Sequence, residues 1–239
     1  MSKIWNRGFS ITWLGHSAFE VITPGGKTLL LDPWVTGNPK TPEDRRVIAK
    51  ADVICVSHAH GDHVGDVPDI ATRTGAKVVC GFEVGEHLEA KGVTTCCGMG
   101  MGGTQRIDGL AFTMVNAVHS SSFDEPGRPN GGGEGGFVIT LEDGTVLYFA
   151  GDTGPTMDMH ITRELYAPEI AFLPVGDHYT MGPREAAWAT QTLGVKWVLP
   201  MHWGTFGLLT GTPAALREAL AKRGCDAQVL DLTPGVAVS

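Results

Sequence analysis

A short segment reading SHAHGDH holds three histidines and one aspartate: His58, His60, Asp62 and His63. Imidazole nitrogens and carboxylate oxygens suit Zn²⁺, and also Mn²⁺, Fe²⁺ or Ni²⁺. His58 and His60 stand two apart after the apolar run 52–56, so in an extended chain both side chains leave the same face. We expect Gly61 to let the chain turn and to aim the next two side chains at a neighbouring point. This coincidence at a strand end favours a metal site over a chance cluster on a solvated loop.

Further ligand candidates come directly after three other apolar runs. Polar residues in such places gather where loops surround a site on a rigid scaffold. Taken singly, each would more often be a structural residue, but beside the histidine cluster the ligand interpretation is favoured for all three. The sequence therefore predicts two divalent cations, Zn²⁺ first and Mn²⁺, Fe²⁺ or Ni²⁺ as alternatives, held by His58, His60, Asp62, His63, His119, Asp152 and His202.

The types and order of these residues resemble the ligand set of the metallo-β-lactamase superfamily, over residues 52–202. In that family the residue matching Asp152 bridges both metals. The resemblance also implies a first metal held by His58, His60 and His119, and a second held by Asp62, His63 and His202.

A narrower resemblance rests on short motifs, which are WLGHS at 13–17, LDP at 31–33, HSS at 119–121, GDTG at 151–154, TMGP at 180–183 and PMH at 200–202. These motifs are similar to those of a metal-dependent hydrolase branch related to ascorbate-6-phosphate lactonase and, more distantly, to the N-acylphosphatidylethanolamine phospholipase D. Asp152 stands where true class B β-lactamases carry Cys, which disfavours β-lactam hydrolysis. His60 stands where flavodiiron proteins carry Glu, which disfavours an oxygen-reducing centre.

A hydroxide shared between the two cations is the expected nucleophile of a hydrolysis. The resemblance implies that its substrate is a lactone or ester of a small metabolite. One alternative is a phosphodiesterase, including a phospholipase-D-like activity. It would need to stabilise an additional negative charge, for which the nearby basic candidates are Arg128 and Arg184. Another alternative is a metal-binding protein without turnover, although the complete ligand set argues against it.

Three residues are candidates for acting on the substrate. Asp62, unless fully engaged as a ligand, is expected to handle the proton. His16 and His178 follow strand-like runs, where loops reach toward the metals. His178 is expected to donate a hydrogen bond to the developing oxyanion or leaving group, or to bind the substrate. For both residues the alternative is a histidine that braces a neighbouring ligand or loop. Asp32 is expected to orient a metal-bound histidine through its second ring nitrogen, to form the turn before Pro33, or both.

These residues need a scaffold that brings their strand ends together. Runs 10–14, 18–22 and 27–31 predict antiparallel strands, and 52–56 predicts a buried one. Helices are expected over 64–74 and 83–91, a flexible loop over 98–103, a site-bordering loop over 120–136 and a hairpin around an Asp-Gly turn over 137–150. Helix–strand alternation follows to residue 230. Two sheets face to face with helices on both outer faces satisfy this order, so we expect an α/β (α+β) fold, a four-layer αββα sandwich in one domain over 1–239.

Composition limits the class of partner. The chain has 239 residues, a net charge of −8 and no basic run, so a nucleic-acid partner is disfavoured and a small-molecule substrate is expected. Its five cysteines show no CxxC spacing, which favours a reducing compartment. The first ten residues lack the apolar core of a signal peptide, and no stretch has the length of a membrane span. We therefore expect a cytoplasmic protein, with homo-oligomerisation left open.

Overall fold

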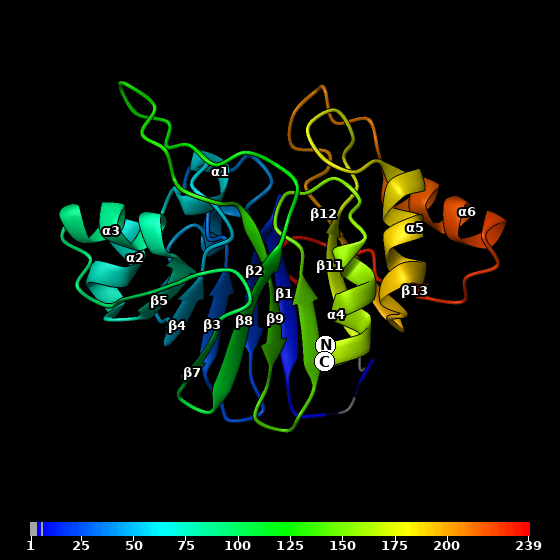
Figure 1. Cartoon of the computed structure of the whole chain (residues 1–239), viewed down its shortest axis with the longest axis horizontal. Coiled ribbons are helices and arrows are strands. Elements are labelled where there is room, and N and C mark those ends of the chain that lie inside the picture. Colours follow the sequence, from blue (N-terminus) through cyan, green and yellow to red (C-terminus); the bar gives the residue numbers. More distant parts are fainter. Residues whose placement is uncertain (1–3, 6) are drawn as a thin grey trace.

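Two seven-stranded sheets pack against each other with helices on their outer sides (Figure 1), in a computed structural model that describes residues 4, 5 and 7–239. The predicted αββα arrangement is confirmed. Part of the N-terminal segment that bears on the signal-peptide prediction, residues 1–3 and 6, lies outside the described residues. None of the helices in the described part of the chain has the length and apolar character needed to cross a membrane.

The first sheet has the order β14-β1-β2-β3-β4-β5-β6. Its strands β1 to β3 form the predicted antiparallel meander, and β3 to β6 run parallel. The bounds are β1 Ser10–Gly15, β2 Ala18–Ile22, β3 Thr28–Leu31, β4 Val53–Cys55, β5 Lys77–Gly81, β6 Cys96–Met99 and β14 Ala237–Val238.

The second sheet has the order β13-β12-β11-β10-β9-β8-β7. Strands β7 to β10 are antiparallel and include the predicted hairpin, whereas β10 to β13 are parallel. The bounds are β7 Thr104–Ile107, β8 Leu110–Asn116, β9 Gly135–Thr140, β10 Val146–Phe149, β11 Ile170–Pro174, β12 Trp197–Met201 and β13 Gln228–Val229.

Helices cover both outer faces of the sheets (Figure 1). On the first sheet lie α2 and α3, and beside the second lie α4, α5 and α6. The bounds are α1 Gly61–Val64, α2 Val67–Thr74, α3 Phe82–Ala90, α4 Asp158–Tyr166, α5 Pro183–Leu193 and α6 Pro213–Lys222, with a 3₁₀ turn at Glu43–Arg45.

Strand β4 shows why an unbroken apolar run marks a buried strand. Val53 and Cys55 pack into the core between the sheets, whereas Ile54 and Val56 pack into the core beneath α2 and α3. Because successive side chains of a strand point to opposite faces, a strand covered on both sides must be apolar at every position. The segment that holds His58 and His60 therefore begins at the end of a strand that is buried on both faces.

Two sequence-based predictions need correction. The Gly-rich run 98–103 is not wholly a flexible loop, since Gly98 and Met99 pair with β5 as part of β6. The helix predicted over 64–74 is divided into α1 and α2, and α1 begins at Gly61, so Asp62 and His63 lie on a helical turn. Gly61 does not have a positive φ, and a Cβ there would meet only the end of the exposed Asp124 side chain, at 2.8 Å, so the backbone turn at this position does not depend on glycine.

The carboxyl ends of the strands that precede the candidate residues all lie at one end of the molecule. β1 and β3 are both antiparallel to β2, and β8 and β10 are both antiparallel to β9, so each pair runs in one direction and the parallel strands continue it. The two sheets are tied at this end, where the His202 backbone N–H donates to the His16 carbonyl at 3.1 Å. Residues far apart in the sequence therefore meet above one edge of the sandwich.

Left-handed backbone occurs at three of these strand ends. His16, Asp32 and His202 have φ values of 54°, 40° and 54°, and each comes directly after a strand. Non-glycine residues rarely adopt such values. Each residue in this conformation costs on the order of 1–3 kcal/mol, which the packing around it must offset. The left-handed conformation turns the chain sharply after each strand, so that each side chain lies over the edge of the sheets.

Replacement of Gly176 by alanine is expected to destabilise the fold, because a Cβ at this position would overlap the carbonyl oxygen of His202. Overpacking of this kind costs typically about 1–3 kcal/mol. Thermal unfolding of the metal-free Gly176→Ala protein measures the effect. Gly100→Ala is the matched control, since its Cβ would meet nothing within 4 Å. Equal stability of the two variants would contradict this account of the close contact.

Candidate metal centre

One group of candidate ligands consists of His58, His60 and His119, whose ligand atoms lie within 4.8 Å of one another. Two of them come from the segment after β4 and the third from the loop after β8. The His58 Nε2 and His60 Nδ1 atoms are 3.0 Å apart. The two residues that the sequence places two apart thus point their nitrogens to one position.

A second group contains His16, Asp62, His63 and His202, again with ligand atoms within 4.8 Å of one another. They come from three places in the chain: the end of β1, two successive positions of α1, and the end of β12. Asp62 Oδ2 is 3.1 Å from His16 Nε2 and 3.9 Å from His202 Nε2. The sequence had placed His16 among the catalytic candidates, and the structure brings it into the same group as three predicted ligands.

The carboxylate of Asp152 stands between the two groups. Its Oδ2 atom is 3.6 Å from His119 Nε2 in the first group. It is also 3.3 Å from His63 Nε2 and 3.0 Å from His202 Nε2 in the second. A single oxygen within reach of both groups is the position that a bridging ligand would take.

The donor set fits transition-metal cations. Two ligands held at about 2.0–2.2 Å from one tetrahedral cation lie roughly 3.3–3.6 Å apart, and several separations in the two groups fall in or near this range. His63 Nε2 and Asp152 Oδ1 are also buried without a hydrogen-bond partner among the described residues. Leaving buried polar atoms unpaired costs about 1–3 kcal/mol each, and a bound cation would remove that cost.

The histidines of the first group are held in the form that a metal requires. Burial lowers the pKa of His58 well below its usual range, and neighbouring His63 lowers it further. Burial also lowers the pKa of His60 and of His119. Since only a neutral imidazole has a free lone pair, these rings are ready to bind a cation near neutral pH.

Three carboxylates set the charge around His63 in the second group. Burial alone would lower the pKa of His63, but the charges of Asp152, Asp62 and Asp32 outweigh it and raise that pKa well above its usual range. Burial would raise the pKa of Asp152, yet His202 and His63 bring it well below its usual range. The carboxylates that attract a proton to His63 attract a divalent cation by the same Coulombic force, so the metal and the proton compete.

A fully buried carboxylate orients one histidine of each group. Asp32 Oδ2 lies 2.6 Å from His63 Nδ1 and accepts the Ser57 hydroxyl at 2.5 Å. The Ser57 hydroxyl oxygen is in turn 2.9 Å from His58 Nδ1. Asp32 thus faces the second ring nitrogen of a candidate ligand, which is the placement expected from the sequence. Sequence reasoning missed Ser57, although its position beside His58 was a usable signal.

A cavity of about 770 Å³ opens onto the centre. His60, Asp62, His119, Asp152 and His202 line its base. Arg128 lies in its wall, but Arg184 does not and has a side chain 93% exposed, so Arg184 is not a nearby cation. His178 is exposed and lies outside the described lining, whereas its neighbour Tyr179 is part of it. The role expected for His178 stays a prediction.

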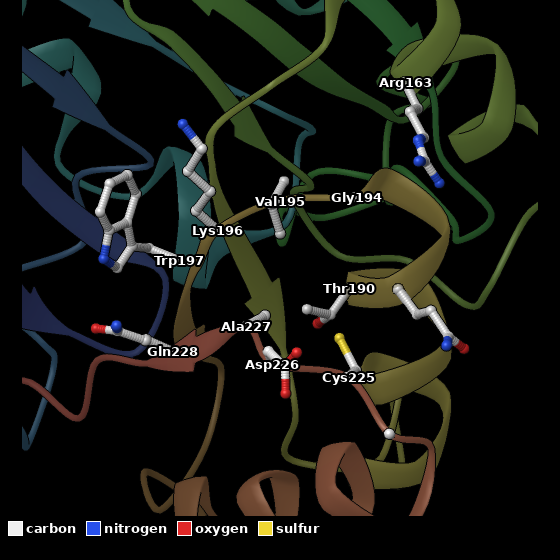
Figure 2. A pocket seen from close by; sticks show the side chains of 12 residues that line it. Arg163, Thr190, Gly194, Val195, Lys196, Trp197, Cys225, Asp226, Ala227 and Gln228 are labelled. Atoms are coloured by element: carbon white, nitrogen blue, oxygen red, sulfur yellow. The ribbon is translucent and has the colours of Figure 1, made fainter.

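A second cavity, of about 590 Å³, lies at the amino end of β12, opposite the end that carries His202 (Figure 2). Its lining includes the charged side chains of Arg163, Lys196 and Asp226 and the thiol of Cys225. None of the candidate ligand groups of the described chain reaches it. The polar groups therefore converge on the first cavity.

Comparison with known proteins identifies relatives over almost the whole chain. The Beta-lactamase superfamily domain matches residues 27–203. A UPF0173 metal-dependent hydrolase of Koribacter versatilis is 46% identical over 96% of this chain and 97% of its own length. Another, from Methanopyrus kandleri, is 42% identical over 94% of this chain and 97% of its own length.

Solved structures agree with these relatives. A metallo hydrolase from the hyperthermophilic archaeon Ignicoccus hospitalis superposes with a TM-score of 0.85 at 36% identity, over 96% of this chain and 97% of its own. An isothiocyanate hydrolase from Delia radicum gut bacteria has a TM-score of 0.72 at 19% identity, over 96% and 98%, which shows a shared fold.

Replacement of Asp32 by asparagine is expected to weaken metal binding by about 10- to 100-fold, because the amide no longer holds His63 through a charged hydrogen bond. Competition with a chromogenic chelator measures the affinity. Asp69→Asn is the control, since Asp69 is an exposed carboxylate paired with Arg73. If both variants bind metal as the unmodified protein does, the orienting role of Asp32 is refuted.

Proposed function

Because the chain belongs to the metallo-β-lactamase superfamily and, within it, to the UPF0173 metal-dependent hydrolases, we propose that it hydrolyses a carboxylic ester or lactone of a small metabolite at a binuclear metal centre. The proposed ligands are His58, His60 and His119 for one cation and Asp62, His63 and His202 for the other, with Asp152 shared. The observation that carries the proposal is the position of the Asp152 carboxylate between the two groups, at the base of an open cavity.

Two divalent cations there would supply Lewis acidity and a water of lowered pKa. The reaction adds the oxygen of water to the carbonyl carbon and breaks the bond from that carbon to the alcohol oxygen. That oxygen must then take up a proton. The attacking water releases a proton as it adds to the carbonyl carbon, and a carboxylate at the cavity surface can pass this proton to the alcohol oxygen.

Asp62 is our candidate for this proton transfer. It lies at the cavity surface, while His16 approaches it from behind and is fully buried. Burial, joined by His202, lowers the pKa of His16 to about 4, so its ring is neutral near pH 7. A neutral ring facing a carboxylate donates its one N–H from Nε2, and Nδ1 then accepts from the Thr205 hydroxyl at 2.9 Å. We propose that His16 positions Asp62 and does not itself bind metal.

Phosphodiester hydrolysis is supported less well. It needs cations for the additional negative charge, and Arg184 is not among the residues that line the cavity. Arg128 lines the cavity but is bound to Asp124 at 3.1 Å. A metal-binding protein without turnover would not need a cavity of this size above the ligands. The lactone or ester class also agrees with the resemblance of the sequence motifs to the ascorbate-6-phosphate lactonase branch.

The setting in which we place the reaction is cytoplasmic. The five cysteines are all free thiols. Thiols persist in reducing compartments, whereas oxidising compartments favour disulfides.

Removal of the shared carboxylate tests the binuclear centre. We expect about two equivalents of transition metal per chain in protein purified without chelator. Asp152→Ala should lower the occupancy of both positions and abolish ester and lactone hydrolysis, because one oxygen serves both groups. Elemental analysis and turnover are measured on the same samples. Asp158→Ala, at the start of α4 and outside the cavity, is the control. Wild-type turnover in Asp152→Ala would remove Asp152 from the centre.

Two histidine variants separate substrate roles from metal binding. His16→Ala should keep its metal and lose about 10- to 100-fold in rate, since Asp62 is no longer held by the ring of His16. His178→Ala should also keep its metal, because this residue lies outside the ligand groups. A comparable loss of rate would assign His178 to the substrate, and an unchanged rate would leave it structural. Loss of metal in His16→Ala would make His16 a ligand and overturn its proposed role.

A further inference from the structure

The cavity above the metal centre has two chemically different walls. One wall, from the loop after β8, carries Ser120, Asp124 and Arg128. The other is formed by the large apolar or aromatic side chains Trp34, Tyr179, Phe206 and Leu208, which come from three separate loops. The loop that carries Arg128, in green, and the loop that carries Phe206, in orange, rise on either side above the carboxyl ends of the strands (Figure 1).

The apolar wall faces solvent. Tyr179 and Leu208 are 53% and 54% exposed, and Phe206 is 39% exposed. Clustered exposed apolar side chains mark binding surfaces, and ligand cavities are lined mainly by such groups. Because these side chains border the same cavity as the candidate ligands, a substrate bound at the centre would cover them.

The apolar wall lies on the side of the proposed proton donor. The ring centroids of Trp34 and Phe206 are 5.5 and 5.3 Å from that of His16. His16 Nε2 is in turn 3.1 Å from the Asp62 carboxylate. Asp62, Trp34 and Phe206 line the same cavity, so an ester whose alcohol oxygen lies beside Asp62 would place the carbon attached to that oxygen near Trp34 and Phe206.

The charges of the cavity argue against an anionic group on the substrate. Among the described lining residues Arg128 is the one Lys or Arg side chain. Its guanidinium is bound to Asp124 at 3.1 Å, and the other oxygen of that carboxylate accepts the Gly61 N–H at 3.2 Å. A phosphate at this guanidinium would lie beside a carboxylate that is held at the start of α1 and would be repelled by it. A neutral substrate meets no such repulsion.

We infer that the substrate is an uncharged ester or lactone that bears an alkyl or aryl group on its alcohol carbon, and that Trp34, Phe206 and Leu208 select for this group. The inference rests on the proposed hydrolase function and adds the substrate class. It departs from a phosphorylated sugar lactone, which the resemblance to ascorbate-6-phosphate lactonase suggests.

A series of lactones tests the position of the alkyl group. γ-Valerolactone, γ-hexalactone and γ-octalactone carry a growing alkyl chain on the alcohol carbon, and α-alkyl-γ-butyrolactones of equal size carry it on the acid side. Each methylene buried is worth about two- to fourfold in binding. With metal-loaded protein, kcat/KM should rise on the order of tenfold or more from the γ-methyl to the γ-butyl compound. A flat γ series, or an equal rise in the α series, overturns the inference and leaves the hydrolase function standing.

Variants connect this selectivity to the wall. Phe206→Ala and Leu208→Ala should flatten the γ-alkyl dependence while γ-valerolactone is still hydrolysed. Leu165→Ala is the control, because Leu165 is equally apolar and 65% exposed but lies on α4 outside the cavity. An unchanged dependence in both cavity variants would show that the wall does not select the substrate.

A binding measurement separates failure of the wall from failure of the hydrolase function. 1-Hexanol and ethanol are titrated into chelator-treated protein while tryptophan fluorescence is recorded, with Trp34→Phe identifying the signal of Trp34. Saturable binding of 1-hexanol, at least tenfold tighter than ethanol and weakened in Phe206→Ala, supports the apolar subsite even if no lactone is hydrolysed. Absence of that binding overturns the subsite, whatever the catalytic activity.

Discussion

The carboxylate of Asp152 lies within 3.6 Å of ring nitrogens from three histidines that the chain delivers from different places. Such a cluster is stable only if cations or protons balance its charge and if the surrounding backbone prevents it from opening. The fold meets the second requirement. Two buried sheets carry the strand ends to one edge, and the His202 N–H to His16 carbonyl hydrogen bond joins them there. The first requirement accounts for the raised pKa of His63, on which the charges of Asp152, Asp62 and Asp32 outweigh burial.

Local backbone preferences are violated where the site is built. His16, Asp32 and His202 adopt positive φ values that residues with a Cβ avoid, and they do so directly after regular strands. Gly176 packs so closely on the His202 carbonyl that only glycine fits. A strained backbone conformation persists at such positions because many packing contacts around it hold it in place. Conformations of this kind are frequent at functional sites. The core between the sheets supplies that packing.

Polarity changes with depth in the cavity. The base holds buried carboxylates and imidazoles that suit cations, whereas the mouth has a paired guanidinium on one side and exposed aromatic and aliphatic side chains on the other. A reactive carbonyl suits the base, and an uncharged hydrophobic group suits the mouth. In our proposal, the metal ligands at the base of the cavity provide the hydrolytic chemistry. Loops at its mouth, such as the one that carries Phe206, recognise the substrate.

The sequence by itself determined the metal-binding chemistry and the layered fold. Residue type, spacing and the unbroken apolar run before His58 are local signals, and they identified the candidate ligands and most strands. Local signals missed the strand pairing of the Gly-rich run near Met99, which depends on its neighbour β5. They also left His16 undecided, because its role depends on Asp62 and Thr205, which are 46 and 189 positions away. Only the tertiary structure decided which arginine reaches the cavity and which side chains form its apolar wall, since both follow from how separate loops pack above the strand ends.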